Sequence, residues 1–402
     1  MRAVVFTLGC KVNEAESASI LAALEQMGWE ADDKLSYADA YILNTCAVTR
    51  EAEKKSRQLI ARVKKFNENA EIFVCGCASE KDRNSFEQRG VTFVTGARDK
   101  QGVIDAFAKH YGISSAIMPF PKQTRTRAFI KIQDGCNNFC SYCIIPYLRG
   151  REVSRPTEDI IDEINSTNCP EIVLNGINIS SYEGGLERLI NVLKGVDKRI
   201  RLGSLECSAI TDGLLTALKG LKDFAPQFHL SLQSGSSSVL KAMNRHYTRE
   251  EYLEKCAKIY KHFPDAAITT DIIAGFATET EEDFLQSLSI IDEACFARIH
   301  AFAYSPREGT TAYKLKDIPP EIKKDRLKRL LSAAKLSEER YISRFLGTTR
   351  EIIAEEIEDG YTSGYTDNYI RVYIKDNIKA GEKLRVKLTQ IFKDGVLAVN
   401  EG

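Results

Sequence analysis

The chain has 402 residues, of which 43% are hydrophobic, and its 56 basic residues balance 56 acidic ones. This length exceeds what one ordinary hydrophobic core supports, so two or three domains are expected. A formal net charge of zero argues against a protein that coats nucleic acid through bulk charge.

The first part of the chain alternates short apolar runs with amphipathic stretches. The opening run, residues 3–8, is too short for a signal peptide or a membrane span, so we expect a cytoplasmic protein with no membrane partner. The alternation is typical of a parallel sheet with helices on both faces, and predicts a doubly wound domain over 1–117. The expected strands are 3–8, 40–43, 71–74 and 91–94, and the expected helices are 13–27 and about 49–66.

After residue 117 we expect a linker and then a partial (β/α) barrel. Residues 118–127 contain two prolines and no apolar period, and predict a linker. Over 128–345 strand–helix alternation resumes and predicts a partial (β/α) barrel, which carries its chemistry on loops at the carboxyl ends of its strands. Its expected strands are 129–132, 171–174, 200–202, 228–232, 268–273 and 299–303.

A long helix is expected at about 320–345, at the end of the central domain. Short alternating runs split by glycines follow it and predict a small β-barrel over 346–402. The fold class is therefore α/β with an all-β unit at the C-terminal end.

Three cysteines, Cys136, Cys140 and Cys143, follow the first strand of the central domain in a C-x3-C-x2-C pattern. A structural zinc site closes its tetrahedron with four protein ligands, and no histidine lies nearby in the sequence to complete one. A 4Fe-4S cluster held by three thiolates instead leaves one iron open for another ligand. The pattern favours the open cluster, and a zinc site completed by a distant residue is the alternative.

Cys10, Cys46 and Cys77 each lie just after one of the first three expected strands. In a parallel sheet the loops after the strands lie along one edge, so these side chains can converge on a second three-thiolate site. Cys75 is the alternative to Cys77, but it falls at the end of the strand and not in the loop. The other cysteines are expected to pack as small hydrophobic residues: Cys169, Cys207, Cys256 and Cys295.

The C-x3-C-x2-C pattern, with the aromatic Tyr142 before its last cysteine, resembles the signature of the radical S-adenosylmethionine (SAM) enzymes. A three-cysteine domain, a radical SAM domain and a C-terminal β unit called TRAM follow in the same order in the methylthiotransferases. Further stretches similar to this family are 146–152, 231–235, 243–245, 271–276 and 304–310.

This resemblance implies an enzyme that replaces an aromatic C–H by C–SCH3 with two equivalents of SAM. One equivalent yields a 5′-deoxyadenosyl radical, and the other donates the methyl group. The cofactors implied are two 4Fe-4S clusters and SAM, and the partners implied are a low-potential electron donor and transfer RNA.

The resemblance also implies roles for individual residues. The radical cluster would be held by Cys136, Cys140 and Cys143, and the sulfur-donating cluster by Cys10, Cys46 and Cys77. Around SAM we expect Tyr142, Asn175, Gly176, Glu206, Gln233 and Arg245. Arg245 would clamp a carboxylate, because a guanidinium offers two parallel donors. The arginines just past the cluster loop are expected to meet the anticodon loop: Arg149, Arg151 and Arg155.

The stretch Gly9-Cys10-Lys11-Val12-Asn13 resembles the branch of this family that modifies C2 of N6-threonylcarbamoyladenosine at position 37 of transfer RNA. Within the family, the alternative substrates are isopentenyladenosine in transfer RNA and a ribosomal protein. An alternative of another class is a zinc-stabilised RNA-binding protein without catalysis. We expect a monomer.

The C-terminal unit departs from what a TRAM domain is expected to carry. Residues 345–402 hold eight basic and ten acidic residues, so positive charge does not support RNA binding there. The alternative contacts are its aromatic residues Tyr361, Tyr365, Tyr369 and Tyr373.

Overall fold

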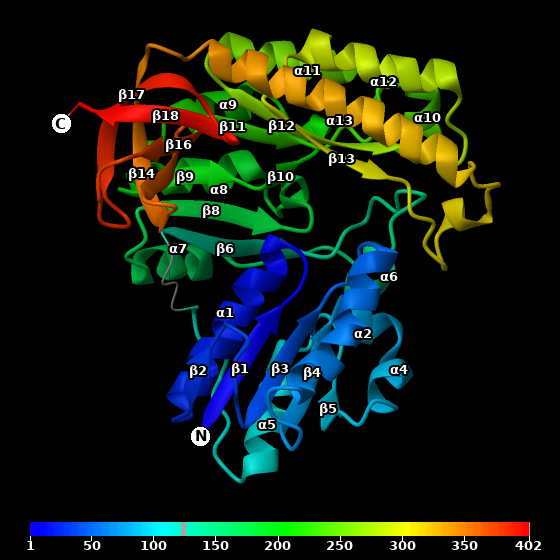
Figure 1. Cartoon of the computed structure of the whole chain (residues 1–402), viewed down its shortest axis with the longest axis vertical. Coiled ribbons are helices and arrows are strands. Elements are labelled where there is room, and N and C mark those ends of the chain that lie inside the picture. The colour runs from blue at the N-terminus through cyan, green and yellow to red at the C-terminus, as the bar shows by residue number, and fades with distance from the viewer. Residues whose placement is uncertain (122–125, 402) are drawn as a thin grey trace.

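The computed structural model describes residues 1–121 and 126–401, so residues 122–125 of the predicted linker lie outside the described residues. Three units follow one another along the chain (Figure 1). An N-terminal sheet lies at the bottom of this view, two curved sheets lie above it, and a small β-barrel lies beside the curved sheets. No described helix is long and apolar enough to cross a membrane.

The N-terminal unit is a parallel sheet with strand order β2-β1-β3-β4-β5. Its elements are β1 (Arg2–Thr7), α1 (Lys11–Gln26), β2 (Glu30–Asp32), β3 (Ala40–Thr45), α2 (Arg50–Lys64), β4 (Glu71–Gly76), α3 (Cys77–Lys81), α4 (Arg83–Glu87), β5 (Phe93–Val94) and α5 (Lys100–Tyr111). Alternate residues of the central strand enter opposite apolar clusters, Tyr41 and Leu43 on one face, Ala40 and Ile42 on the other. Both faces are thus covered, which confirms the predicted doubly wound architecture.

The middle of the chain forms two curved sheets, with strand orders β7-β6-β8-β9 and β10-β11-β12-β13. Their strands are β6 (Arg127–Asp134), β7 (Val153–Ser154), β8 (Glu171–Gly176), β9 (Arg199–Leu202), β10 (Ser204–Leu205), β11 (Gln227–Leu230), β12 (Ala267–Ala274) and β13 (Arg298–Ala303). Their helices are α6 (Ile145–Arg149), α7 (Thr157–Ser166), α8 (Leu186–Val192), α9 (Asp212–Lys219), α10 (Ser237–Ala242), α11 (Arg249–His262) and α12 (Glu281–Ala294). This half-barrel confirms the predicted partial barrel.

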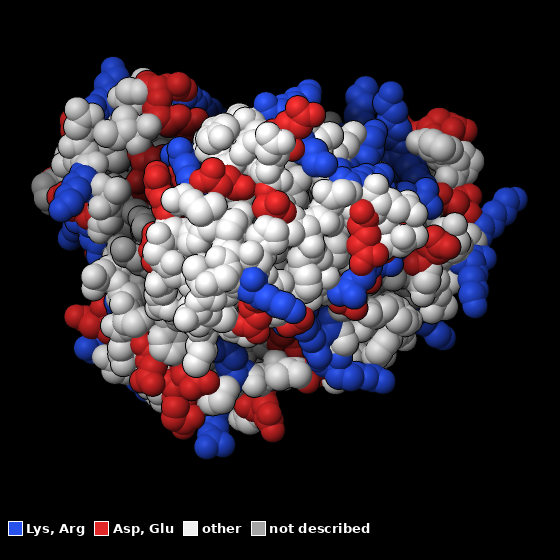
Figure 2. Space-filling model, turned by 90° about the horizontal axis from the view of Figure 1, so that it is seen from below, with Lys and Arg blue, Asp and Glu red and all other residues white. Residues whose placement is uncertain are grey.

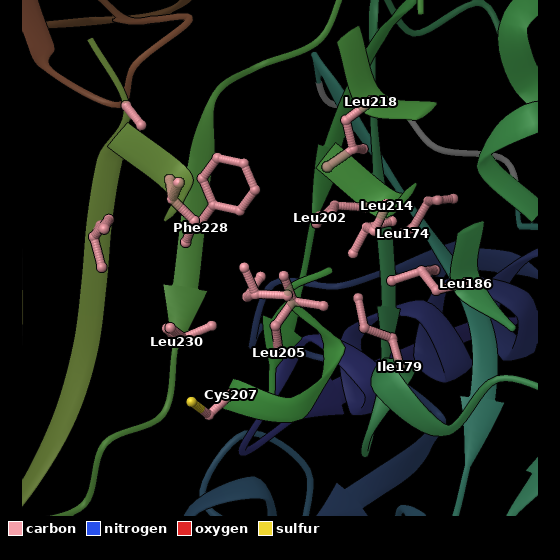
Figure 3. Close-up of a cluster of buried hydrophobic side chains, with 14 of the residues drawn as sticks. Leu174, Ile179, Leu186, Leu202, Leu205, Cys207, Leu214, Leu218, Phe228 and Leu230 are labelled. Carbon is pink, nitrogen blue, oxygen red and sulfur yellow. The ribbon is translucent and has the colours of Figure 1, made fainter. Parts of the chain in front are cut away.

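The outer face of the half-barrel is apolar, whereas its inner face carries several polar side chains. Leu174, Leu202, Phe228 and Leu230 point outward into one buried cluster beneath the helices (Figure 3). Because successive residues of a strand point to opposite faces, the residues between them face inward. The inward-facing residues of β11 and β12 include Gln227, His229, Thr269 and Asp271, which line the cavity. A closed (β/α)8 barrel fills its interior with apolar side chains, so this polar lining indicates a binding site.

The long helix α13 (Pro320–Ser343) leads into the C-terminal β-barrel, which closes in the order β14-β15-β16-β18-β17. Its strands are β14 (Thr349–Glu358), β15 (Tyr361–Thr366), β16 (Arg371–Ile374), β17 (Lys383–Phe392) and β18 (Gly395–Asn400). The turn between β15 and β16 packs against the base of the half-barrel. There Arg201, on β9, donates to the carbonyl oxygens of Thr366 and Asp367, each at 3.4 Å.

Two aromatic residues expected at an RNA surface are engaged at this contact instead. The rings of Tyr365 and Tyr369 stack with centroids 5.0 Å apart, and guanidinium groups of the half-barrel cover them. Arg127 lies 4.7 Å from the ring centroid of Tyr365, and Arg201 lies 5.3 Å from that of Tyr369. Both rings cover the base of the half-barrel, and contact with RNA stays a prediction for this pair.

The surface charge follows the balanced composition on the face seen from below. Figure 2 shows basic and acidic residues interspersed around a broad uncharged area. That face of the molecule therefore offers no continuous basic surface to a nucleic acid.

Candidate active site

A cavity of about 570 Å³ lies where the carboxyl edge of the N-terminal sheet meets the mouth of the half-barrel. Both predicted cysteine triads line it, although they come from separate units of the fold. Within each sheet the parallel strands place the loops at their carboxyl ends on one side, and the two edges face each other across the cavity. The cysteines on the cavity are Cys10, Cys46, Cys77, Cys136, Cys140 and Cys143.

The N-terminal triad follows three neighbouring strands of the sheet. Cys10 precedes α1, Cys46 lies between β3 and α2, and Cys77 is the first residue of α3. Gly9, with φ of +114°, allows the first loop to approach the second, since a Cβ there would lie 2.9 Å from the Cys46 Sγ atom. Cys75 is fully buried in the strand core and does not line the cavity, which supports the choice of Cys77.

The second triad sits on the loop between β6 and α6. The backbone N–H of Ser141 donates to the carbonyl oxygen of Met243 at 2.9 Å, which ties this loop to the end of α10. The Arg245 guanidinium donates to the Cys140 Sγ atom at 3.4 Å and pairs with Glu206 at 3.0 Å. A cationic donor beside this sulfur would stabilise the thiolate that a metal ligand must supply.

Several thiols of the cavity are protonated at neutral pH. Burial raises the pKa of Cys46 to about 11, and that of Cys136 likewise to about 11. Burial and the neighbouring Cys140 sulfur raise the pKa of Cys143 to about 12. Binding of iron would therefore release protons from these side chains.

The spacing of the cysteines suits an iron–sulfur cluster better than a single zinc ion. Thiolates around one zinc ion lie at about 2.3 Å from it, and so within about 4 Å of one another. Among the described residues, His229, Asp271 and His300 form the one group of possible metal ligands whose ligand atoms all lie within 4.8 Å of one another. The cysteine triads are wider, as expected where each sulfur binds a different iron.

The residues expected around SAM all line this cavity: Tyr142, Asn175, Gly176, Glu206, Gln233 and Arg245. Asn175 is 2% exposed, and its Oδ1 atom has no hydrogen-bond partner among the described residues. The same holds for the Oδ1 atom of Asn178, which sequence analysis missed. Buried acceptors without a donor are costly, so these two atoms fit a ligand that brings N–H or O–H groups.

Backbone geometry adds to this fit. Gly176 leaves room that any side chain would fill, since a Cβ there would lie 2.8 Å from the carbonyl oxygen of Gln133. Gln233 adopts a φ of +71°, which is uncommon for a residue other than glycine. Its backbone is held there by β12, because its N–H donates to Asp271 and its carbonyl accepts from Ile273. Strain of this kind is often found at binding sites.

The structure corrects the prediction for Arg149, which cannot meet an anticodon loop because its side chain is fully buried. Its guanidinium bridges Glu16 on α1 and Asp134 on β6, with contacts of 3.0 Å to each. It also donates from Nε to the Cys77 Sγ atom at 3.4 Å. Nothing in the sequence indicates this network, because its members lie far apart in the chain.

The Arg149 network carries a charge suited to a thiolate site. Lys100 and Lys131 also pair with Glu16, so three cations face the two carboxylates of Glu16 and Asp134. Burial would raise the pKa of Glu16, but these three cations together hold it well below its usual range. The network carries one net positive charge, and its Arg149 guanidinium contacts the Cys77 Sγ atom, where it would offset a thiolate.

Replacing Arg149 by Leu should destabilise the protein by about 3–5 kcal/mol, because Glu16 and Asp134 would keep buried charges without their main partner. Urea unfolding of the variant under anaerobic conditions measures this as a lower midpoint. Arg151→Leu is the matched control, and at an exposed side chain it should change stability by less than about 0.5 kcal/mol. Equal midpoints for the Arg149 variant and the wild type would contradict the proposed role of the network.

The other two arginines predicted to bind RNA do not line the cavity. Arg151 is exposed near its mouth, and its guanidinium lies 4.7 Å from the ring centroid of Phe139. Arg155 is engaged by the Glu163 carboxylate and by the carbonyl oxygen of Lys131. Contact with RNA stays a prediction for both, and Arg151 is the more accessible of the two.

Comparison with known proteins decides the family. Residues 2–96 match the model of an uncharacterized protein family, UPF0004, and residues 130–291 match that of the radical SAM superfamily. A relative from Chlamydia pneumoniae, named threonylcarbamoyladenosine tRNA methylthiotransferase MtaB, is 38% identical over 87% of this chain and 86% of its own. The chain belongs to the radical SAM methylthiotransferases. It is therefore an enzyme, and its family implies a 4Fe-4S cluster and SAM.

Identity alone does not separate the branches of this family. A methylthiotransferase from Clostridium perfringens (strain SM101), named tRNA-2-methylthio-N(6)-dimethylallyladenosine synthase, is also 38% identical, over 82% of this chain and 81% of its own. Among solved structures, the radical SAM methyltransferase TsrM from Kitasatospora setae matches with a TM-score of 0.56 and 14% identity over 76% of both chains. A likeness at that identity shows the shared fold.

Proposed function

We propose that this methylthiotransferase adds a methylthio group to C2 of N6-threonylcarbamoyladenosine at position 37 of transfer RNA. The observation that carries the proposal is the shared cavity, because its walls bring two cysteine triads to one space. Cys136, Cys140 and Cys143 would hold one 4Fe-4S cluster, and the N-terminal triad would hold a second. Each triad would leave one iron open.

When bound, the clusters and SAM supply the radical and the sulfur, and the chain's own residues hold and orient them. Asn175 and Asn178 offer buried acceptor atoms to SAM, and Gln233 faces the same space. Arg245 stands beside Cys140, within reach of a carboxylate that would compete with Glu206 for it. The turn between β15 and β16 covers the base of the half-barrel and would keep water out.

Relatives of both the threonylcarbamoyl and the dimethylallyl branch cover most of the chain, so the choice of substrate rests on the lining of the cavity. One wall of the half-barrel interior carries the polar side chains of His229, Asp271 and His300. A polar wall suits the polar threonylcarbamoyl group better than an apolar dimethylallyl group.

Residues 1–117, 128–345 and 346–402 would act as the auxiliary-cluster, radical SAM and TRAM domains, joined by the linker at 118–127. Arg151 and Arg155 would approach the anticodon loop. The enzyme would act as a cytoplasmic monomer that receives electrons from a low-potential donor.

Mass spectrometry of nucleosides from transfer RNA, with and without this gene, tests the proposed function. We expect the 2-methylthio derivative of threonylcarbamoyladenosine to disappear when the gene is deleted. Loss of the isopentenyl derivative instead would assign the enzyme to the other branch of the family. No change in any methylthio nucleoside would overturn an RNA substrate and point to a ribosomal protein. A colourless, zinc-loaded preparation would favour the non-catalytic alternative.

A further inference from the structure

Lys11 differs from the other cations of the cavity because its ammonium group makes no ion pair in the described part of the chain. The two arginines of the lining are each engaged by carboxylates. The Lys11 Nζ atom instead lies 6.0 Å from the ring centroid of Phe129, on β6. Glu14 also lines the cavity from α1, but it is not within ion-pair distance of Lys11. The side chain is exposed, so its charge is available to a ligand.

The backbone of Lys11 holds its side chain at the junction of the two units. It is the first residue of α1 and directly follows Cys10 of the auxiliary triad. The Asn175 Nδ2 atom, on β8, donates to the carbonyl oxygen of Lys11 at 3.4 Å. A ligand of Lys11 would therefore lie beside the auxiliary triad and within the mouth of the half-barrel.

His300 supplies a second unused polar group in the same cavity. It is exposed, and its side chain makes no hydrogen bond to another described residue. Its neighbour His229 is oriented by Thr269 at 3.1 Å and by Asp271 at 3.2 Å, so the wall beside His300 is fixed. Burial and the nearby positive charges, including Lys11, lower the pKa of His300, and the Asp271 carboxylate only partly opposes them. A neutral imidazole still offers one N–H donor.

We propose that Lys11 and His300 form a subsite that binds the carboxylate of the N6 substituent of the adenosine. This inference rests on the proposed function. C2 and C6 of adenine flank the same ring nitrogen, so the substituent on N6 lies close to the carbon that receives the methylthio group. A threonylcarbamoyl group carries a carboxylate, whereas a dimethylallyl group carries no charge. The unpaired ammonium of Lys11 beside the auxiliary triad would therefore favour the threonylcarbamoyl group over the dimethylallyl group.

The test compares three anticodon stem-loop RNAs that differ at position 37. They carry threonylcarbamoyladenosine, its neutral methyl ester, or unmodified adenosine, and fluorescence anisotropy measures their binding to the anaerobic holoenzyme. The wild type should bind the acid about tenfold to a hundredfold more tightly than the ester, as expected for a charge-assisted hydrogen bond. Lys11→Met should abolish this preference, and Lys11→Arg should keep most of it.

Two controls separate this subsite from other roles of a lysine. Lys54→Met removes an exposed lysine of α2 outside the cavity, and it should weaken binding of the three RNAs equally or not at all. Iron and sulfide contents of the Lys11 variants report whether the neighbouring triad is intact. His300 lies on β13, in the other unit of the fold, so His300→Ala tests the subsite even if a Lys11 variant fails to fold; it should reduce the acid-over-ester ratio.

Each other outcome overturns the inference in a distinct way. If Lys11→Met weakened the binding of all three RNAs equally, Lys11 would contact the phosphate backbone instead. An unchanged acid-over-ester ratio in both the Lys11 and His300 variants would place the carboxylate elsewhere. If the wild type forms no methylthio product from the threonylcarbamoyl RNA, the proposed function itself fails. If it forms that product while the variants keep their preference, only the subsite fails.

Discussion

Replacing Cys140 by Ala should abolish formation of 5′-deoxyadenosine from SAM. Two thiolates cannot hold the cluster that three are proposed to hold, and Cys140 is the central ligand of its loop. The variant also leaves Arg245 beside an alanine, so its guanidinium loses the sulfur it contacts at 3.4 Å. Chromatography of the reaction with dithionite as reductant measures 5′-deoxyadenosine, and iron analysis of the same sample measures the cluster.

Cys256→Ala is the matched control for this variant. Cys256 lies on α11, is 2% exposed and packs in the main core, away from the cavity. Its loss removes a buried sulfur and should lower stability modestly, while SAM cleavage continues. Wild-type amounts of 5′-deoxyadenosine from the Cys140 variant would rule out the proposed radical cluster.

Replacing Cys46 by Ala should have a different effect, because this residue belongs to the other triad. We expect SAM cleavage to continue while no methylthio product forms from the RNA. Iron content should fall to about half, since one of two four-iron clusters is lost. Incubation of the variant with SAM, reductant and the threonylcarbamoyl stem-loop, followed by mass spectrometry of both products, measures the two reactions together.

Cys75→Ala provides the comparison, since Cys75 lies two residues from Cys77 but is buried in the strand core. This variant should retain both iron and methylthio product. If Cys75→Ala lost the methylthio product and Cys77→Ala kept it, Cys75 and not Cys77 would be the third auxiliary ligand. Methylthio product from the Cys46 variant would refute the second cluster.

Local patterns in the sequence predicted much of the fold and the meeting of the two triads. Apolar runs located most strands of the N-terminal sheet and of the two curved sheets, and parallel topology then placed Cys10, Cys46 and Cys77 on one edge. The prediction missed β2, whose sequence Glu-Ala-Asp contains no apolar run. It also missed α5, which packs against the sheet through Val103, Ile104 and Phe107.

The Arg149 network could not be predicted in the same way. The position of Arg149 just past the cluster loop suggests a surface cation, and nothing local marks it as buried. Its partner Glu16 is 133 residues away and reaches it only after the two units pack together. Similarly, alternation located β11 and β12 but did not tell which face of each strand would become the polar interior.

The contacts across the seam between the N-terminal sheet and the half-barrel bear on relative motion. Arg149 and Lys131 reach across it to Glu16, and Arg307 reaches across it to Glu53 and to the carbonyl oxygen of Ala47, next to Cys46. A hinge opening here would strip buried charges of their partners, which is costly. These contacts therefore favour a fixed separation of the two triads. We expect a large substrate to bind without closure of the two units around it.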